Sequence, residues 1–531
     1  MVHRMLLVSI LCVFAVSSSA QKNKDSRIIL HHADKLYKNA NDPRAQVLIG
    51  HVRLSHEGLF LDCDSARYYQ MENSFDAYGH VKMMQGDTLK LNSDSLFYDG
   101  YAMQMMARGK KVVLTHRKSR LETTKLDYDR VSGVGSYFNG GTLYDADNVL
   151  VSDEGQYTTG SREAFFTYNV CLTNPKFNLV SDTLYYYTDT ENARIVSPTN
   201  ITSSDGTFIY STQGDYDTKR GVADMYTRSY IIKDMRKIVG DDLHYDKATG
   251  ISTGYGNVII TDDENMCSLI GDYCWFDENT GNAFATDNAV AMEYSSPDTL
   301  YVHADTLKMF TYNMDTDSVY RNLHAYHKVR AYRRDVQAVC DSLVSLELDS
   351  CTYLYGQPII WNENQQVFGE EIRIYNNDST INWAHIINQA MTVERLDSVS
   401  YNQVMAKEMK CFFVNGEIEH NEAQGNVYVC YFMEEDDGNR FGMNYTETTE
   451  LKLYMENRKI KKIWMPAASC MMYPPTQIPS DRRYLSAFAW FDYIRPVSKD
   501  DIYEWRDKDA KNILKETPRQ VVPLQKLDDV K

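Results

Sequence analysis

The chain of 531 residues is long enough for several domains or for one extended repeat array. Its formal net charge of −17 argues against nucleic acid as a partner, because such binding depends on Lys and Arg neutralising phosphates. With 43 % hydrophobic residues and 39 tyrosines, the composition favours a folded protein with much pleated, half-buried surface and excludes a largely disordered one.

The first twenty residues have the pattern of a secretory signal peptide. His3 and Arg4 precede an apolar run over residues 5–16 that is too short to span a bilayer, and small residues follow as far as Ala20. We therefore predict a signal peptide at residues 1–20, cleaved near Ala20, and a mature protein outside the cytoplasm.

A repeat of about 30 residues dominates the rest of the chain. A phrase with an acidic residue near its start and an aromatic residue at its end recurs at intervals of 29 or 30 residues, and it continues less regularly at Met309, Tyr353, Tyr375 and Phe412. The regular copies end at Tyr68, Tyr98, Tyr128, Tyr157, Tyr186, Tyr216, Tyr245 and Trp275. Because a unit this short cannot bury its own apolar face, the units must stack on one another.

Two sets of short strands alternate within each repeat. One set carries the aromatic residue and, two positions earlier, an apolar or small residue such as Leu96. The other set is predicted to begin with Gly or Asn, as in "GHVKM" from Gly79 or "GNVII" from Gly256, with apolar residues at alternate positions. A period of two over short runs indicates half-buried strands. The residues therefore predict an all-β fold, either a solenoid or a folded-over sheet, over residues 21–433.

The character of the chain changes after residue 433. Residues 434–470 suggest a turn and two final strands, whereas residues 471–531 are rich in Pro and aromatic residues and end in a charged stretch that could form a short helix. Because Pro cannot occupy a central strand, the last segment is expected to be an extended strap or cap over an open edge. A docking site for a partner is the other interpretation, since exposed aromatic residues beside Arg favour interfaces.

The sequence offers no strong metal, disulfide or catalytic pattern. The recurring aspartates are better explained by turns and strand starts than by calcium binding, because they lie about 30 residues apart, and His31, His32, His324 and His327 lack ligand partners at a suitable spacing. An enzyme acting on glycosides needs one singular pair of carboxylates, whereas the acids here recur with the repeat. We therefore predict no catalytic residues, no metal and no cofactor. Nine cysteines remain after the predicted cleavage site, at positions 63, 171, 267, 274, 340, 351, 411, 430 and 470, and none forms a Cys-x-x-Cys motif.

Four phrases carry a resemblance to a known family: "VLIGHVRLSHEGLFLDCDSARYY", "GDTLKLNSDSLFYDG", "SPTNITSSDGTFIYSTQGDYD" and "NGEIEHNEAQGNVYVCYF". Together they resemble the OstA-like family, which comprises the lipopolysaccharide-transport protein LptA of the periplasm and the N-terminal domain of LptD. The resemblance covers roughly residues 27–435. It implies a slightly twisted β-jellyroll whose inner groove holds lipid acyl chains, a periplasmic location beside the outer-membrane assembly machinery, and edge-to-edge association with other lipopolysaccharide-transport proteins. This chain differs from the short bridge protein in its length and in its C-terminal segment.

The apolar columns of the repeat are the candidate lipid-binding site. Tyrosine would suit the rim of such a groove, with its ring inward and its hydroxyl in water. The expected groove-lining residues are Val52, Leu54, Tyr68, Val81, Met83, Leu96, Tyr98, Leu126, Tyr128, Leu184, Tyr186, Leu243, Tyr245, Val258 and Ile260. The competing interpretation is a structural or interaction protein of the cell envelope in which the same columns form a closed core.

Overall fold

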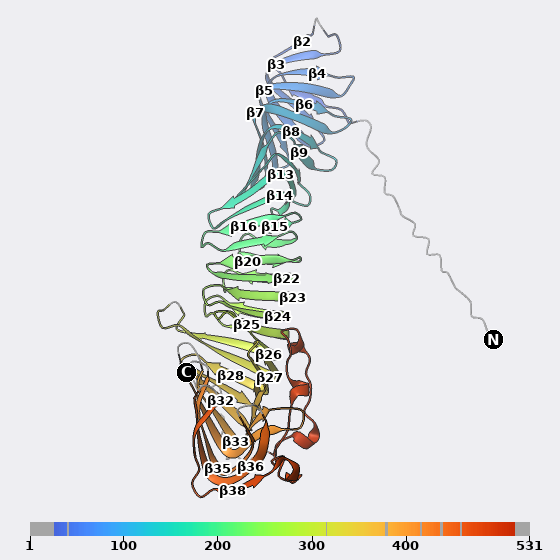
Figure 1. Ribbon diagram of the computed structural model, residues 1–531. Coiled ribbons are helices and arrows are strands. Elements are labelled where there is room, and N and C mark those ends of the chain that lie inside the picture. The colour runs from blue at the N-terminus through green and yellow to red at the C-terminus, as the bar shows by residue number, and fades with distance from the viewer. Residues whose placement is uncertain are drawn as a thin grey trace, which may run out of the picture. The chain divides into compact units, whose positions relative to one another are not determined.

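The computed structural model describes residues 26–39, 42–314, 316–377, 381–414, 417–435, 439–456 and 459–515 (Figure 1). The predicted signal peptide at residues 1–20 and the end of the charged tail lie outside these ranges. The described residues form 38 strands and four short 3-10 helices, and the recorded strand pairs are antiparallel. The prediction of an all-β fold is confirmed.

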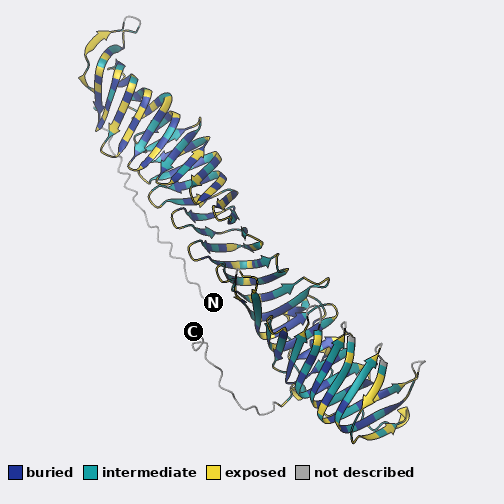
Figure 2. Ribbon diagram, turned by 90° about the vertical axis from the view of Figure 1, so that its left-hand side faces the viewer, coloured by how far each residue is buried: buried dark blue, intermediate teal, exposed yellow. Residues whose placement is uncertain are grey.

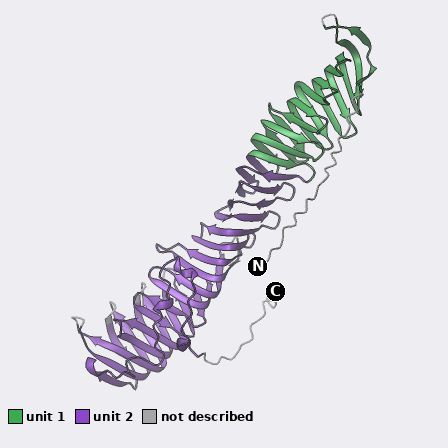
Figure 3. Cartoon of the chain, turned by 90° about the vertical axis from the view of Figure 1, so that its right-hand side faces the viewer, with its two compact units in different colours: residues 1–175, 182–189 green, residues 176–181, 190–531 purple. Residues whose placement is uncertain are grey.

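The chain divides into two compact units (Figure 3). Unit 1 comprises Met1–Pro175 and Asp182–Asp189, and unit 2 comprises Lys176–Ser181 and Thr190–Lys531. Strand β14 (Phe177–Tyr187) contributes residues to both units. Unit 1 contains β1 (Ile29–His32), β2 (Lys35–Lys38), β3 (Gln46–His56), β4 (Leu59–Tyr69), β5 (Ser74–Gln85), β6 (Leu89–Asp99), β7 (Gln104–His116), β8 (Ser119–Asp129), β9 (Val134–Tyr137), β10 (Gly141–Asp145), β11 (Asn148–Ser152), β12 (Glu154–Thr158) and β13 (Glu163–Asn174).

Unit 2 contains the remaining strands and all four 3-10 helices. Its first strands are β15 (Asn192–Ile195), β16 (Thr199–Ser203), β17 (Phe208–Ser211), β18 (Gly214–Asp217), β19 (Val222–Met225), β20 (Ser229–Lys233), β21 (Arg236–Gly240), β22 (Asp242–Asp246), β23 (Ile251–Asp262), β24 (Cys267–Asp277), β25 (Ala283–Glu293), β26 (Leu300–Tyr312), β27 (Tyr320–Tyr332) and β28 (Val336–Leu346). The others are β29 (Cys351–Tyr355), β30 (Ile359–Asn362), β31 (Gln365–Phe368), β32 (Glu371–Asn376), β33 (Ile381–Arg395), β34 (Tyr401–Val414), β35 (Glu417–Glu434), β36 (Arg440–Glu456), β37 (Lys459–Trp464) and β38 (Ser469–Tyr473).

Many strands contain a corner, which corrects one prediction. The glycines of the "GHV" and "GNV" phrases do not begin strands but lie inside them, and two consecutive residues there have positive φ, as at Gly79 (76°) and His80 (41°) in β5. The strand pairing shifts register at the same point, between Tyr78 and Val81. Such a bulge bends a strand and increases its twist. A glycine with positive φ suits a turn and a bulge equally, so local sequence could not distinguish them.

An aspartate of the neighbouring strand faces several of these corners. In one, Nδ1 of His80 lies 2.7 Å from Oδ2 of Asp64, and in another the backbone N–H of Lys110 donates to Oδ2 of Asp94 at 2.7 Å. These carboxylates were expected at turns and strand starts, but they belong instead to the strand corners.

The corners fold the sheet of unit 1 onto itself. The strand ladder places Tyr98 of β6 in line with Gln46, at the start of β3, whereas His56 ends that strand ten residues later. A flat sheet would separate the two positions by about 33 Å. Nδ1 of His56 nevertheless lies 2.7 Å from the Tyr98 hydroxyl. Each layer therefore has two arms: an aromatic arm, such as residues 96–98, and a valine arm, such as residues 81–83. The inner faces of the arms enclose the core, and buried and exposed residues alternate along the strands (Figure 2).

After β38, residues 474–515 form a strap with no further strand. It contains η1 (Pro475–Gln477), η2 (Asp492–Ile494), η3 (Asp501–Tyr503) and η4 (Ala510–Asn512). The strap begins beside β36 and reaches β26 and β27, where Figure 1 shows it in red. In the described part of the charged tail, a single 3-10 turn, η4, occurs where a short helix was considered.

Candidate functional site: the apolar interior and its opening

All fifteen residues predicted to line a groove lie on inner faces of the arms. Each is buried, with an exposed fraction of at most 6 %. In unit 1 they occupy β3–β6, β8 and the end of β14, and in unit 2 they occupy β22 and β23. Alternation placed their side chains correctly, but they contact protein atoms so closely that no open trough runs along these columns.

The tyrosine hydroxyls do not point into water, contrary to the expectation for a groove rim. Arg130 Nη1 donates to the Tyr98 hydroxyl at 2.7 Å, and that hydroxyl can donate its own proton to Nδ1 of His56. The Tyr186 hydroxyl donates to Oδ2 of Asp145 at 2.9 Å. Burial raises the pKa of Tyr98, because an ionised phenol would lose its hydration there.

We call the line where the free ends of the two arms meet the seam. In unit 1, Arg130 closes the seam. Its Nη2 donates to the carbonyl of Glu57 at 3.0 Å and its Nε donates to Oε1 of Gln85 at 3.0 Å, in addition to the bond from Nη1 to the Tyr98 hydroxyl. In unit 2, Lys247 Nζ lies 3.1 Å from Oδ2 of Asp205. Polar contacts therefore join the two arms over an apolar interior.

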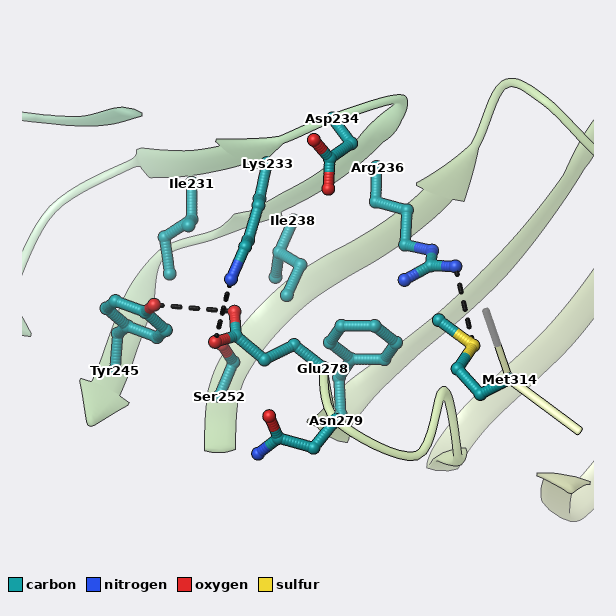
Figure 4. Close-up of a pocket in the computed structure, with 11 residues that line it drawn as sticks. Ile231, Lys233, Asp234, Arg236, Ile238, Tyr245, Ser252, Glu278, Asn279 and Met314 are labelled. Atoms are coloured by element: carbon teal, nitrogen blue, oxygen red, sulfur yellow. Dashed lines mark hydrogen bonds and ion pairs between the residues drawn. The ribbon is translucent and has the colours of Figure 1, made fainter. Parts of the chain in front are cut away.

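The seam of unit 2 has an opening at a cavity of about 230 Å³ (Figure 4). Its apolar lining includes Ile231, Ile238, Tyr245 and Phe276, all buried residues of the interior. Tyr245 is one of the predicted lining residues. Burial raises its pKa, and the carboxylate of Glu278 raises it further.

Charged side chains stand at the rim of this cavity. Lys233 Nζ lies 3.1 Å from Oε1 of Glu278, and this ion pair joins the two arms. The Tyr245 hydroxyl donates to Oε2 of Glu278 at 3.4 Å. Arg236 points toward Met314 on the other side, with Nη2 3.8 Å from Sδ (Figure 4).

A second cavity of about 20 Å³ shares Arg236 and Phe276 with the first. It reaches the predicted lining residue Ile260 and the nearby Leu269. Asp262 lies 3.6 Å from Arg236 and 3.5 Å from Arg321, so its carboxylate balances part of their positive charge.

An apolar floor below a charged rim suits an amphiphilic molecule with an anionic head. The larger cavity has the volume of about eight water molecules in the liquid, so it has room for a segment of one acyl chain. Several acyl chains would fit only if the arms separated along the seam.

The sequence reasoning missed the rim of this site. Lys233, Arg236 and Glu278 look like ordinary turn residues beside strand ends, because their neighbours across the seam are more than 40 positions away. One usable signal was the group of three cations in "KDMRK" (Lys233–Lys237) between two apolar strands.

Metal and thiol chemistry find little support here. Within the described ranges, no group of three or more His, Cys, Asp or Glu side chains is arranged to hold a metal ion. The nine cysteines considered above are all free thiols in the structure. Burial raises the pKa of Cys267, which lines the second cavity, to about 11, so this thiol is a weak nucleophile at neutral pH.

Comparison with known proteins adds one finding. Residues 25–182 match the family model described as OstA-like protein, whereas no curated protein matches the chain. The family is a transport family associated with the cell envelope and with lipopolysaccharide. Among the described residues, no helix is long and apolar enough to cross a membrane. Over residues 25–182, the chain is therefore similar to the OstA-like family.

Proposed function

We propose that this protein binds the acyl chains of lipopolysaccharide between the two arms and helps to carry the lipid through the periplasm to the outer membrane. The observation that carries the proposal is the stack of apolar inner faces, repeated layer after layer in an OstA-like chain. The cavity below Lys233 and Glu278 supports it, because the interior opens there beside charges that suit a lipid headgroup.

The energetics favour binding once the arms part. Burying a methylene of the lipid contributes about 0.8 kcal/mol. A typical hydrogen bond such as those of the seam contributes about 1 kcal/mol net. Because the acyl chain replaces the opposite arm as the apolar neighbour, a segment of several methylenes offsets the loss of a few seam contacts. Similar surfaces in successive layers would then let the chain move from one layer to the next.

Association by strand edges would extend the path to other lipopolysaccharide-transport proteins. Among the residues that the structure describes, β1 and β2 of unit 1 pair only with β3, and β37 and β38 of unit 2 pair only with β36. The unpaired backbone groups of such edge strands are suited to pairing with a further strand.

Photo-crosslinking tests the proposal. A photoreactive residue replaces Leu96 or Leu243 in the full-length protein produced in cells that make lipopolysaccharide, and matched variants carry it at the exposed positions Lys90 and Asp242 on the same strands. We expect labelled lipopolysaccharide from the inward positions only. Native mass spectrometry of the purified mature protein should also detect bound lipid. If the inward positions label no lipid and none co-purifies, the proposal is wrong.

A closed-core structural protein is the second candidate, because the burial of all fifteen inner residues favours it. It predicts that Leu96→Asp unfolds the protein, since a carboxylate would enter a permanently closed core. A variant that remains folded, as judged by circular dichroism, but no longer carries lipid would contradict this alternative.

A further inference from the structure

The strap is held by side chains of the strands rather than by a strand ladder. The backbone-to-backbone hydrogen bonds recorded for residues 474–515 all lie within this segment. The inner column that contains Ile260 continues through Ala331 and Ala338. Because side chains alternate along a strand, Arg330, Gln366 and Gln403 point to the opposite, outer face of the valine arm of β27–β36, and this face supplies polar side chains to the strap. The strap therefore lies on this face as a peptide ligand lies in a groove.

Two glutamines bind the strap in the same way. The Gln403 side chain donates through Nε2 to the carbonyl of Arg483 at 3.0 Å and accepts from the N–H of Leu485 at 2.9 Å. Six residues along the strap, Gln366 repeats the arrangement.

Gln366 donates through Nε2 to the carbonyl of Ala489 at 2.9 Å and accepts from the N–H of Phe491 at 2.8 Å. The Trp361 indole also donates to Oε1 of Gln366 at 3.1 Å, which fixes the orientation of the amide. Within the strap, both glutamines bind only main-chain groups. In each case the carbonyl and the N–H that they bind belong to residues two positions apart.

These amides are deeply buried. Gln366 is 0 % exposed and Gln403 is 1 % exposed. Buried polar groups without partners are strongly unfavourable, so this face requires a ligand that offers backbone N–H and C=O groups. An acyl chain offers neither.

An arginine and a row of apolar contacts complete the groove. Arg330, whose side chain is fully buried, donates to the carbonyl of Ile494 at 2.9 Å and to Oδ2 of Asp501 at 3.2 Å. Phe491 packs edge-on against Phe368 with ring centroids 5.2 Å apart. The buried strap residues Leu485, Ala489, Phe491 and Ile494 share one apolar cluster with Trp361, Met391 and Tyr445 of the strands.

We propose that the outer face of the valine arm of β27–β36 is a peptide-binding groove, that its ligand is an extended polypeptide with the backbone pattern of residues 481–506, and that the chain's own strap is an exchangeable occupant. Residues 474–480, a tether with three prolines that is exposed except at the half-buried Ile478 and Pro479, connect the strap to β38. The same segment of a second copy of the chain fits the groove equally, because the glutamines bind its main-chain N–H and C=O groups. This site is separate from the proposed acyl path.

Peptide exchange tests this inference in the full-length protein. A specific protease site replaces Thr476–Ile478 in the tether, and the cleaved protein is incubated with a labelled synthetic peptide of residues 479–515. We expect the cleaved segment to co-elute with the strands on gel filtration and to exchange slowly with the labelled peptide, as measured by fluorescence anisotropy.

Peptides methylated on the backbone nitrogen of Leu485 or Phe491 remove one hydrogen bond to Gln403 or Gln366 without changing the protein. We expect each to bind at least ten-fold more weakly than a control peptide methylated on the nitrogen of the exposed Lys499. In the protein, Gln366→Met with Gln403→Met should speed release at least ten-fold, whereas the exposed Gln424→Met should not.

Three results would overturn the inference. The labelled peptide fails to enter the cleaved protein, the segment departs on cleavage and does not rebind, or methylation at Phe491 and Leu485 has no more effect than methylation at Lys499. The first result would make the strap a permanent part of the core. Because the peptides test the glutamine contacts from the ligand side, the conclusion does not depend on whether the double variant folds.

Discussion

At the scale of single residues, the interior depends on buried polar groups that meet at the seam. Tyr98, His56 and Arg130 form one such group, and none of their partners is close in sequence. The aromatic residue that marks each repeat therefore has two roles: its ring belongs to the apolar wall, and its hydroxyl links the two arms.

Tyr98→Phe tests the second role. It removes the hydroxyl but retains the ring, and leaves His56 and Arg130 with one partner fewer. We expect the free energy of unfolding to fall by about 1–3 kcal/mol, the cost of leaving buried polar groups unsatisfied. Urea unfolding followed by tyrosine fluorescence measures it. Tyr101→Phe, at an exposed loop position, is the control and should change little; equal effects of the two variants would contradict the role of the hydroxyl.

His56 and His116, whose Nδ1 lies 2.9 Å from the Tyr157 hydroxyl, predict a dependence of stability on pH. Burial lowers the pKa of His56 and of His116 below the ordinary value of 6.5, so the unfolded chain binds more protons than the folded one near that pH. The neighbouring Arg130 and Arg117 act in the same direction. Stability should therefore be greatest above pH 6.5 and decrease as the pH falls below it.

The measurement compares urea midpoints at pH 7.5 and pH 5.0 for the parent and for His56→Asn with His116→Asn. The double variant should lose less stability on acidification than the parent. The reverse order, or no difference, would show that these two histidines are not the groups responsible.

At the scale of elements, the corner is the feature that distinguishes this sheet from a flat one. At Gly79 a Cβ atom would lie 2.3 Å from Oδ2 and 2.9 Å from Cβ of Asp64, and φ is 76°. Gly86, in the turn of the same repeat, also has positive φ, 59°, but no atom lies within 4 Å of its would-be Cβ.

The two glycines make a matched pair of variants. Gly86→Ala should cost about 1–2 kcal/mol, the strain of a left-handed alanine. Gly79→Ala should cost more, because the corner must also move away from Asp64. Urea unfolding of both variants measures the difference. Equal losses of stability in the two variants would mean that the corner accommodates the added Cβ atom without extra strain.

Much of this element-level structure could be predicted from sequence, and part could not. The spacing of Tyr68, Tyr98 and Tyr128 with alternating apolar residues predicted correctly which side chains face inward, because strand alternation is a local property. The corner was mistaken for a strand start, because Gly79 meets Asp64 only through the pairing of β4 with β5. The Gln403 and Gln366 contacts depend on partners 80 or more residues away, and an isolated buried glutamine has no local signature.

At the scale of the whole molecule, the strap and the interior lie on opposite sides of the sheet. Arg330, Gln366 and Gln403 bind the strap from the outer face, whereas the inner columns continue on the other side through residues such as Ala331 and Ala338. The strap therefore does not interrupt the proposed acyl path through the interior of these layers.

A photoreactive residue at Trp361, which is fully buried beside the strap on the outer face, tests this separation of the two faces. We expect it to crosslink to residues of the strap and not to lipopolysaccharide, whereas the same residue at Leu96 or Leu243 labels lipid. Mass spectrometry of the crosslinked peptides identifies the partner. Lipid attached at position 361 would mean that lipid also reaches the outer face beneath the strap.

The sequence by itself determined the all-β class, the repeat length and the inward-facing residues, because strand alternation and stacking follow from the order of side chains along the chain. Only the tertiary structure decided that the strands bend at Gly79 and its counterparts, that Arg130 and Lys247 close the seam, that the interior opens beside Lys233, and that the strap occupies a groove of its own. These features depend on the distance between arms and on contacts between residues far apart in sequence, which the periodicity of a single strand does not contain.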